Sequence, residues 1–179
     1  MPDQPTTLDQ LDIRLLRALA DHPRAGFLEL SRITGTSRVT VQARLERLEE
    51  AGVIRGHAPQ VDLPKAGYPV LAFVTLQISQ GALAEVADHL RALPAVLEAH
   101  ATTGQDDLHC RLAAPSHEGL QEALLALNRI PAVVRTTSVI ALSELVAPRV
   151  LPLLESVERP EPSRVPAFRR DARDARDVR

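Results

Sequence analysis

Hydrophobic residues recur at helical spacing in three stretches in the first third of the chain. The first stretch follows a polar, proline-containing lead, and Pro23 and Gly26 end it. The second is shorter, and the third begins after residue 37. Apolar residues spaced three and four apart lie on one face of a helix. The pattern therefore predicts three helices with facing apolar sides, marked by Leu8, Leu11, Leu15 and Leu19, by Leu30 and Ile33, and by Val41, Leu45 and Leu48.

The junction between the second and third stretches has the form of a tight turn between two helices. Gly35 breaks the periodicity, because glycine adopts backbone angles that other residues avoid. Ser37 stands where a helix N-cap belongs, and Gly52 stands where the third helix should end. For the first helix, Thr7 and Gln10 form a candidate capping box. Residues 29–57 thus predict helix, turn, helix and then the start of a strand.

The outward side of the third helix carries residue types that suit contact with DNA. When the apolar stripe faces inward, the helical period turns cations, an amide and small apolar groups outward. Guanidinium groups bind guanine edges or phosphates, amides bind adenine, and short aliphatic groups contact the thymine methyl. A helical hairpin with an ordinary solvated face also fits the spacing. The residues expected to contact DNA are Ser37, Arg38, Val39, Thr40, Gln42, Ala43, Arg44 and Arg47.

From Tyr68 the pattern changes to alternating strands and helices. The order β-α-β-β-α-β predicts the ferredoxin-like arrangement, an antiparallel sheet with two helices on one face. The other face of such a sheet needs a cover, and dimerisation supplies one. The strands are expected at residues 70–78, 96–103, 107–113 and 133–145, and the helices at residues 83–93 and 116–127.

The expected fold class is α+β, with an N-terminal three-helix helix-turn-helix domain of winged type and a C-terminal ferredoxin-like domain. From residue 158 the chain is rich in Pro, Arg and Asp, and it has too little apolar surface to offset the entropy of ordering. The expected organisation is a helix-turn-helix domain at 1–57, a linker strand or hinge at 58–68, a ferredoxin-like effector-binding and oligomerisation domain at 69–146, a C-terminal arm at 147–157 and a disordered tail at 158–179.

Composition refines this picture. Of the 179 residues, 45% are hydrophobic but only 2% are aromatic, so the cores must be aliphatic. The formal net charge is −2, so a DNA-binding protein of this kind must concentrate its cations locally. No apolar run approaches the roughly 20 residues of a membrane span, and the first residues lack a secretory pattern. We therefore expect a cytoplasmic protein with no membrane partner.

Few residues suggest catalysis. Cys110 lies in an apolar alternation and is expected to fill core space. The histidines of the second half lack metal-ligand spacing, and neither a nucleophile elbow nor a phosphate-binding glycine loop is present. We therefore expect no catalytic residues, no metal and no cofactor. The turn at 102–107 and the hydroxyl cluster at 136–138 could bind an amino acid, since a carboxylate suits its ammonium group. A plain hairpin turn accounts for the same residues.

Two segments carry a resemblance to a known family. LDQLDIRLLRAL, followed by ELSRITGTSRVTVQARLERLEEAGVIRGHAPQVD, resembles the N-terminal domain of the Lrp/AsnC (feast/famine) family of prokaryotic transcription regulators. The resemblance covers about residues 8–146. Thr36 stands where the family usually has leucine in its Gly-Leu-Ser turn, and His57 stands where it usually has tyrosine. The resemblance implies a sequence-specific regulator that binds double-stranded DNA.

The resemblance extends to the expected effector site. Gly104 and Asp107 match the family's Gly-x-x-Asp turn, which helps to build a pocket between neighbouring dimers for an amino acid or similar small effector. Leu108 replaces a common aromatic residue, and Gln105 replaces a common acidic one, so the identity and the existence of the effector stay open. The resemblance also implies a homodimer, with an octamer as the higher assembly, and linker segments that pair between protomers. The expected effector-binding residues are Thr103, Gly104, Asp107, Thr136 and Ser138.

Two other functions remain as alternatives. Sirohaem decarboxylases have a similar two-domain architecture, but they need aromatic and basic groups around a large pocket. This chain has one Tyr and no Trp, and its hairpin lacks their Trp-Pro-Tyr-Asn-type signature. A partner-modulating paralogue that no longer reads DNA is the second alternative. The arginines of the third helix argue against it.

Overall fold

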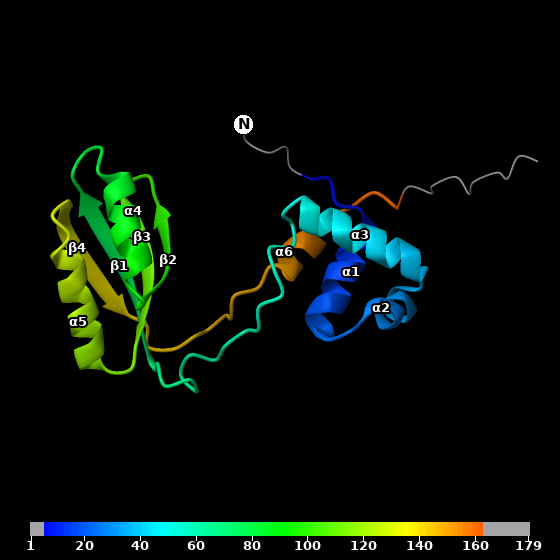
Figure 1. Cartoon of the computed structure of the whole chain (residues 1–179), viewed down its shortest axis with the longest axis horizontal. Helices are drawn as coiled ribbons and strands as arrows, with labels where there is room; N and C mark the ends of the chain where they lie inside the picture. The colour runs from blue at the N-terminus through cyan, green and yellow to red at the C-terminus, as the bar shows by residue number, and fades with distance from the viewer. Residues whose placement is uncertain (1–5, 163–179) are drawn as a thin grey trace, which may run out of the picture. The chain divides into compact units, whose positions relative to one another are not determined.

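The computed structural model describes residues 6–162, which form six helices and four strands (Figure 1). Within this range no helix has both the length and the apolar character needed to span a membrane. The elements are α1 (Gln10–Asp21), α2 (Phe27–Thr34), α3 (Arg38–Glu50), β1 (Val70–Ile78), α4 (Leu83–Ala92), β2 (Val96–Ala101), β3 (Leu108–Ala114), α5 (His117–Asn128), β4 (Val133–Ile140) and α6 (Leu151–Glu155).

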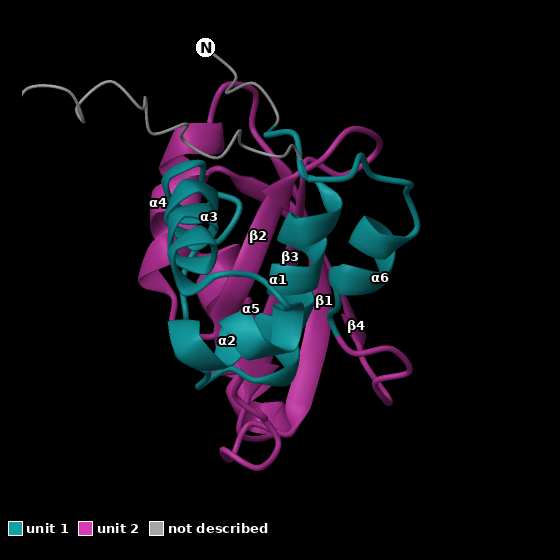
Figure 2. Ribbon diagram, turned by 90° about the vertical axis from the view of Figure 1, so that its right-hand side faces the viewer, with its two compact units in different colours: residues 1–58, 148–179 teal, residues 59–147 magenta. Residues whose placement is uncertain are grey.

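The chain divides into two compact units, which Figure 2 colours separately. The second unit spans residues 59–147. Among the described residues, the first contains residues 6–58 together with residues 148–162, so the chain leaves the first unit and later returns to it. The expected C-terminal arm at 147–157 contains the short helix α6, and these residues belong to the same unit as the helix-turn-helix segment.

The first unit has an aliphatic core made by the facing sides of α1, α2 and α3. Its most deeply buried members include Leu15, Leu30 and Leu48. The capping box of α1 lies two residues later than the sequence suggested. Asp9 is the N-cap, and its side chain accepts the backbone N–H of Asp12 while the Asp12 carboxylate accepts the N–H of Asp9. Because Leu8 is itself buried, the chain enters the core before the helix starts.

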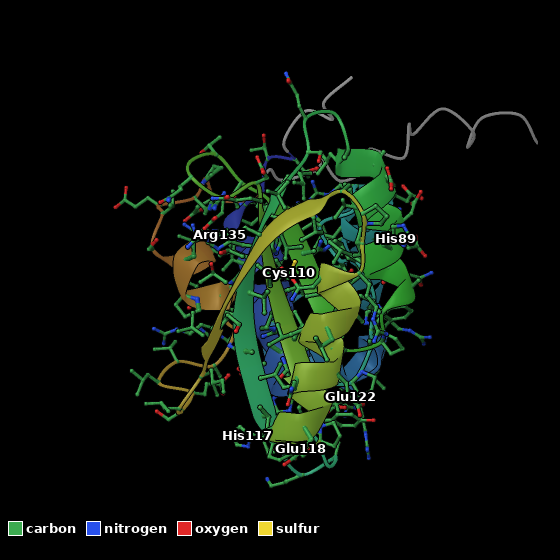
Figure 3. The ribbon with its side chains drawn as sticks, turned by 90° about the vertical axis from the view of Figure 1, so that its left-hand side faces the viewer. His89, Cys110, His117, Glu118, Glu122 and Arg135 are labelled. Atoms are coloured by element: carbon green, nitrogen blue, oxygen red, sulfur yellow. The ribbon has the colours of Figure 1, made fainter. Side chains whose placement is uncertain are left out.

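The second unit is a four-stranded antiparallel sheet in the order β2-β3-β1-β4, as the ferredoxin-like arrangement requires. Alternate residues of β1 and β3 pack against α4 and α5 on one face and form an aliphatic core. Cys110 lies in this core, on the side of the sheet that α4 and α5 cover (Figure 3). Burial raises the pKa of its thiol to about 11, which agrees with the expected packing role.

Two expected strands differ in the structure. Residues 53–57, expected to start a strand, form turns and irregular backbone, since the chain offers them no neighbouring strand within the described residues. The last strand was expected to reach residue 145, but β4 ends at Ile140. The backbone N–H of Ala141 still donates to the carbonyl of Leu71 (2.8 Å), and beyond it the chain leaves the sheet.

Candidate functional site

The turn between α2 and α3 has the geometry that its residues predicted. Gly35 ends α2 in the left-handed region (φ 66°), where a side chain would be strained. The backbone N–H of Thr36 donates to the carbonyl of Ser31 (3.1 Å). Ser37 is the N-cap of α3, and its Oγ accepts the backbone N–H of Thr40 (3.1 Å) and lies 2.8 Å from the Thr40 hydroxyl. These bonds fix the first turn of α3.

The burial of α3 divides its residues into an inner and an outer side as expected. Val41 and Leu48 are fully buried, and Leu45 is 5% exposed. Val39 is 78% exposed, and Gln42 and Ala43 are also exposed. An exposed valine followed by an exposed amide and a small residue leaves a protruding, weakly charged surface on the first two turns. On that surface the Gln42 amide donates to the Glu46 carboxylate (2.9 Å).

Two arginines expected on the DNA-facing side have partners inside the protein instead. Nη1 of Arg44 lies 2.5 Å from Oδ2 of Asp9 and 3.1 Å from Oδ1 of Asp12. Nη2 of Arg47 lies 2.6 Å from Oδ2 of Asp12. The Arg44 side chain is 19% exposed and that of Arg47 is 40% exposed. Both side chains therefore join α3 to α1. Arg38 is exposed, and no ion pair involves it within residues 6–162.

The electrostatics of this cluster favour its charged form. Burial works against ionisation of Asp9, but the N–H of Asp12 and the guanidinium of Arg44 outweigh it and hold the pKa of Asp9 below its ordinary value. Burial likewise opposes the charge of Arg44, and the two carboxylates overcome it and raise the pKa of that guanidinium. Asp9 and Arg44 thus form a charged pair between the start of α1 and α3.

Sequence reasoning missed the contact of Asp9 and Asp12 with α3. Asp12 is fully buried, and it is the only buried charged residue within the described range. A signal was present, because Asp12 lies between the buried residues Leu11 and Ile13. A carboxylate in such a position needs cationic partners. The spacing along the chain did not reveal which cations they would be.

The turn between β2 and β3 is tied to the end of β1. The backbone N–H of Asp107 donates to the carbonyl of Leu76 (2.9 Å), and Oδ2 of Asp107 accepts the N–H of Ile78 (2.8 Å). The N–H of Thr102 donates to the Asp107 carbonyl (2.9 Å) across the turn. Gly104 lies at φ 125°, a conformation that favours glycine. Thr103, Gly104 and Asp107 are exposed, so the turn presents them to solvent.

The two expected hydroxyl residues of β4 lie on the other side of β1 from this turn. Thr136 is opposite Leu76 in the register, and Ser138 is opposite Val74, so both are on the side of the sheet that faces the helices. Ser138 is exposed at the sheet edge. The Thr136 hydroxyl is buried and has no hydrogen-bond partner within the described residues. Asp107 and Thr136 therefore flank the same end of β1.

The C-terminal segment makes an unexpected contact with α1. The backbone N–H of Gln10 donates to the carbonyl of Pro160 (3.1 Å), and the Gln10 amide donates to the carbonyl of Arg159 (3.2 Å). Arg17 forms a two-pronged ion pair with Glu155, with 2.8 Å between Nε and Oε1. Leu154 packs against the core of the helical unit. Residues 158–160, expected to belong to a disordered tail, thus close the N-terminal end of α1. Residues 163–179 of that tail lie outside the described range.

Comparisons with known proteins agree for both units. Residues 8–49 match the model of the AsnC-type helix-turn-helix domain, and residues 71–151 match that of the Lrp/AsnC ligand-binding domain. The HTH-type transcriptional regulator FL11 of Pyrococcus horikoshii is 32% identical over 135 residues, which cover 75% of this chain and 89% of that regulator. FL11 of Pyrococcus abyssi is 33% identical over 136 residues, covering 76% and 90% of the two chains.

Solved structures share the fold of this chain. The structure of E. coli AsnC has a TM-score of 0.77 and 28% identity, and the match covers 82% of this chain and all of that one. A transcriptional regulator of Neisseria meningitidis, solved as a complex with L-Met, also has a TM-score of 0.77, with 27% identity and coverage of 84% and 100%. Both similarities span the helical unit and the sheet.

Proposed function

The chain belongs to the Lrp/AsnC family of helix-turn-helix transcriptional regulators, and we propose that it recognises a specific DNA sequence through the exposed side of α3. It acts by binding rather than by catalysis, and its sheet domain holds a small effector that alters DNA affinity. The observation that carries the proposal is the orientation of α3. Its apolar stripe is buried against α1 and α2, while Val39, Gln42 and Ala43 remain exposed.

In this proposal the first two turns of α3 lie in the major groove. The Arg38 guanidinium binds a phosphate or a guanine edge, the Gln42 amide reads an adenine, and Val39 and Ala43 contact thymine methyl groups. Ser37 and Thr40 lie at the N-terminal end of α3, where hydroxyl and backbone N–H groups can bind phosphate. Arg44 and Arg47 are not assigned to DNA, because their guanidinium groups already bind carboxylates.

A gel-shift experiment with the upstream region of the protein's own gene tests this function. Saturable binding that survives an excess of random-sequence competitor is the expected result. The Gln42→Ala variant should change base preference at one position of each half-site, because it removes a base contact. The Arg38→Gln variant should weaken binding to all sequences if its guanidinium contacts phosphate. Equal, sequence-blind losses from both variants would contradict the assignment of this face.

We further propose that the protein forms a homodimer through the open face of its sheet. That face carries Phe73, which is 50% exposed, and Val139, which is 63% exposed, in adjacent strands. A second copy would remove these apolar side chains from water. A dimer would also give residues 53–57 a second copy of the same segment to pair with. Two α3 helices could then reach successive major-groove turns, about 34–36 Å apart.

The effector is proposed to be an amino acid that binds beside the end of β1, where the contact between neighbouring dimers completes the pocket. Asp107 supplies a carboxylate for the ammonium group, and Gly104 permits close approach to the backbone. The unsatisfied hydroxyl of Thr136 supports a polar ligand here, because buried hydroxyls usually have partners. Thr103 and Ser138 would border the ligand. The L-Met complex of the Neisseria meningitidis regulator suggests that an amino acid is a suitable probe.

A thermal-shift screen against the twenty amino acids tests the effector proposal. A ligand that binds only the native state raises the melting temperature. Asp107→Asn is a suitable control variant, because its amide oxygen can still accept the N–H of Ile78 while the charge is lost. The shift should then disappear without a change in the melting temperature of the unliganded protein. A shift that persists in this variant would place the ligand elsewhere.

A further inference from the structure

Asp12 connects two helices that belong to different parts of the DNA-binding motif. It is fully buried at the start of α1, and both of its carboxylate oxygens are used. Oδ2 accepts the backbone N–H of Asp9 and lies 2.6 Å from Nη2 of Arg47. Oδ1 lies 3.1 Å from Nη1 of Arg44. Asp9 adds a second carboxylate to the same nitrogen of Arg44, with its Oδ2 2.5 Å from Nη1.

The acidic pair, Asp9 and Asp12, forms ion pairs with most of the cations of α3. The helix contains three cations, and two of them are Arg44 and Arg47. A guanidinium that is paired with a buried carboxylate gains little by approaching phosphate, because it must first leave a charge uncompensated inside the protein. The third cation, Arg38, is exposed. The cation at the N-terminal end of α3 therefore remains available to bind DNA phosphate, whereas the two cations further along the helix are paired with carboxylates.

We propose that Asp12, together with Asp9, is a specificity-determining residue that withholds Arg44 and Arg47 from the DNA backbone. The proposal rests on the proposed function, in which α3 lies in the major groove. Phosphate contacts carry no sequence information, and they supply most of the non-specific affinity. A helix with three active arginines would bind any duplex more tightly. Withholding two of them increases the ratio of specific to non-specific binding, which is the quantity that matters on a genome.

The salt dependence of binding to a random-sequence duplex measures the number of active cations. Each phosphate that a protein neutralises contributes about 0.9 to the slope of log affinity against log salt. The experiment uses the full chain, a fluorescently labelled random duplex and a potassium chloride titration followed by anisotropy. Arg47→Gln is expected to leave the slope unchanged. The matched variant Arg38→Gln is expected to lower it by about 0.9 for each protomer that is bound.

Substitution of the carboxylate should have the opposite effect. In Asp12→Asn the side-chain oxygen can still accept the N–H of Asp9, but Arg47 loses its ionic partner. The released guanidinium is already 40% exposed, so it can reach solvent and DNA. The slope should rise by up to about 0.9 per protomer, and the random-duplex affinity should rise with it. The double variant Asp12→Asn/Arg47→Gln should return the slope to that of the unmodified protein.

A merely structural ion pair would lower the melting temperature of these variants without raising the slope. The proposal is overturned if Arg47→Gln lowers the slope as much as Arg38→Gln does, or if a folded Asp12→Asn leaves it unchanged. The comparison of Arg47→Gln with Arg38→Gln needs no change at Asp12. It therefore tests whether Arg47 is withheld from phosphate even if Asp12→Asn does not fold. If both Arg38→Gln and Gln42→Ala leave binding unaltered, α3 does not contact DNA, and the proposed function fails together with this inference.

Discussion

The docking of the C-terminal segment on α1 should weaken when Gln10 is replaced by proline. Gln10 is the first residue of α1, where proline is tolerated because the N–H has no partner within the helix. The preceding residue, Asp9, already has the extended backbone (φ −102°, ψ 178°) that a following proline requires. The substitution therefore removes both Gln10 hydrogen bonds to residues 159 and 160 while leaving the helix able to form.

The size of the effect follows from these two bonds. A hydrogen bond contributes about 0.5–1.5 kcal/mol to stability, and the bond from the exposed Gln10 side chain should lie at the lower end. Their combined loss amounts to about 1–2 kcal/mol, which is roughly a 5- to 30-fold change in the docking equilibrium. The ion pair of Arg17 with Glu155 and the packing of Leu154 remain in the variant. Docking should therefore weaken rather than vanish.

Native-state hydrogen exchange measures this equilibrium. The N–H groups of Leu154 and Ser156 donate to the carbonyls of Val150 and Pro152, and an isolated helix of five residues would not protect them. Their exchange should accelerate by the predicted factor in Gln10→Pro. It should accelerate by less in Gln10→Ala, which keeps the backbone bond. Unchanged exchange in Gln10→Pro would refute the view that these bonds hold the segment. If the global free energy of unfolding fell by the same amount as the free energy of docking, α6 would not open independently of the rest of the protein.

Three further outcomes follow from individual groups. Ser37→Ala should lower the free energy of unfolding by about 1 kcal/mol in urea, because α3 loses its N-cap, whereas Ser37→Asn should largely preserve it. The pKa of Asp9 is lowered on folding, so its contribution to stability is complete above its ordinary value of 3.8 and is lost as the pH falls below it. Acid-unfolding curves should accordingly be shallower in Asp9→Asn. With a thiol pKa of about 11, Cys110 should react with a disulfide reagent at pH 8 only as fast as the sheet domain opens, and rapid labelling of the native protein would contradict its burial.

Local patterns in the sequence determined most of the fold. The spacing of Val41, Leu45 and Leu48 was enough to orient α3, because a helix of fixed period has only one way to bury that stripe. Ser37 and Gly35 marked the turn, since each satisfies a backbone requirement that depends only on nearby residues. The alternation of strands and helices likewise predicted the sheet order. The exposed positions of Val39, Gln42 and Ala43 followed directly from the same period.

The tertiary structure decided which cations of α3 lack a partner in the described residues and what residues 159–160 contact. Arg44 and Arg47 look like DNA-binding residues from their place on the helix, yet their partners lie 32 and 35 residues away on α1. The segment at residues 159–160 looked too polar to order, yet its carbonyls accept hydrogen bonds from Gln10, 149 residues earlier in one case. Periodicity specifies the side of an element on which a residue lies. The partner that it meets there depends on how the elements pack, and only the folded chain brings such distant groups within bonding distance.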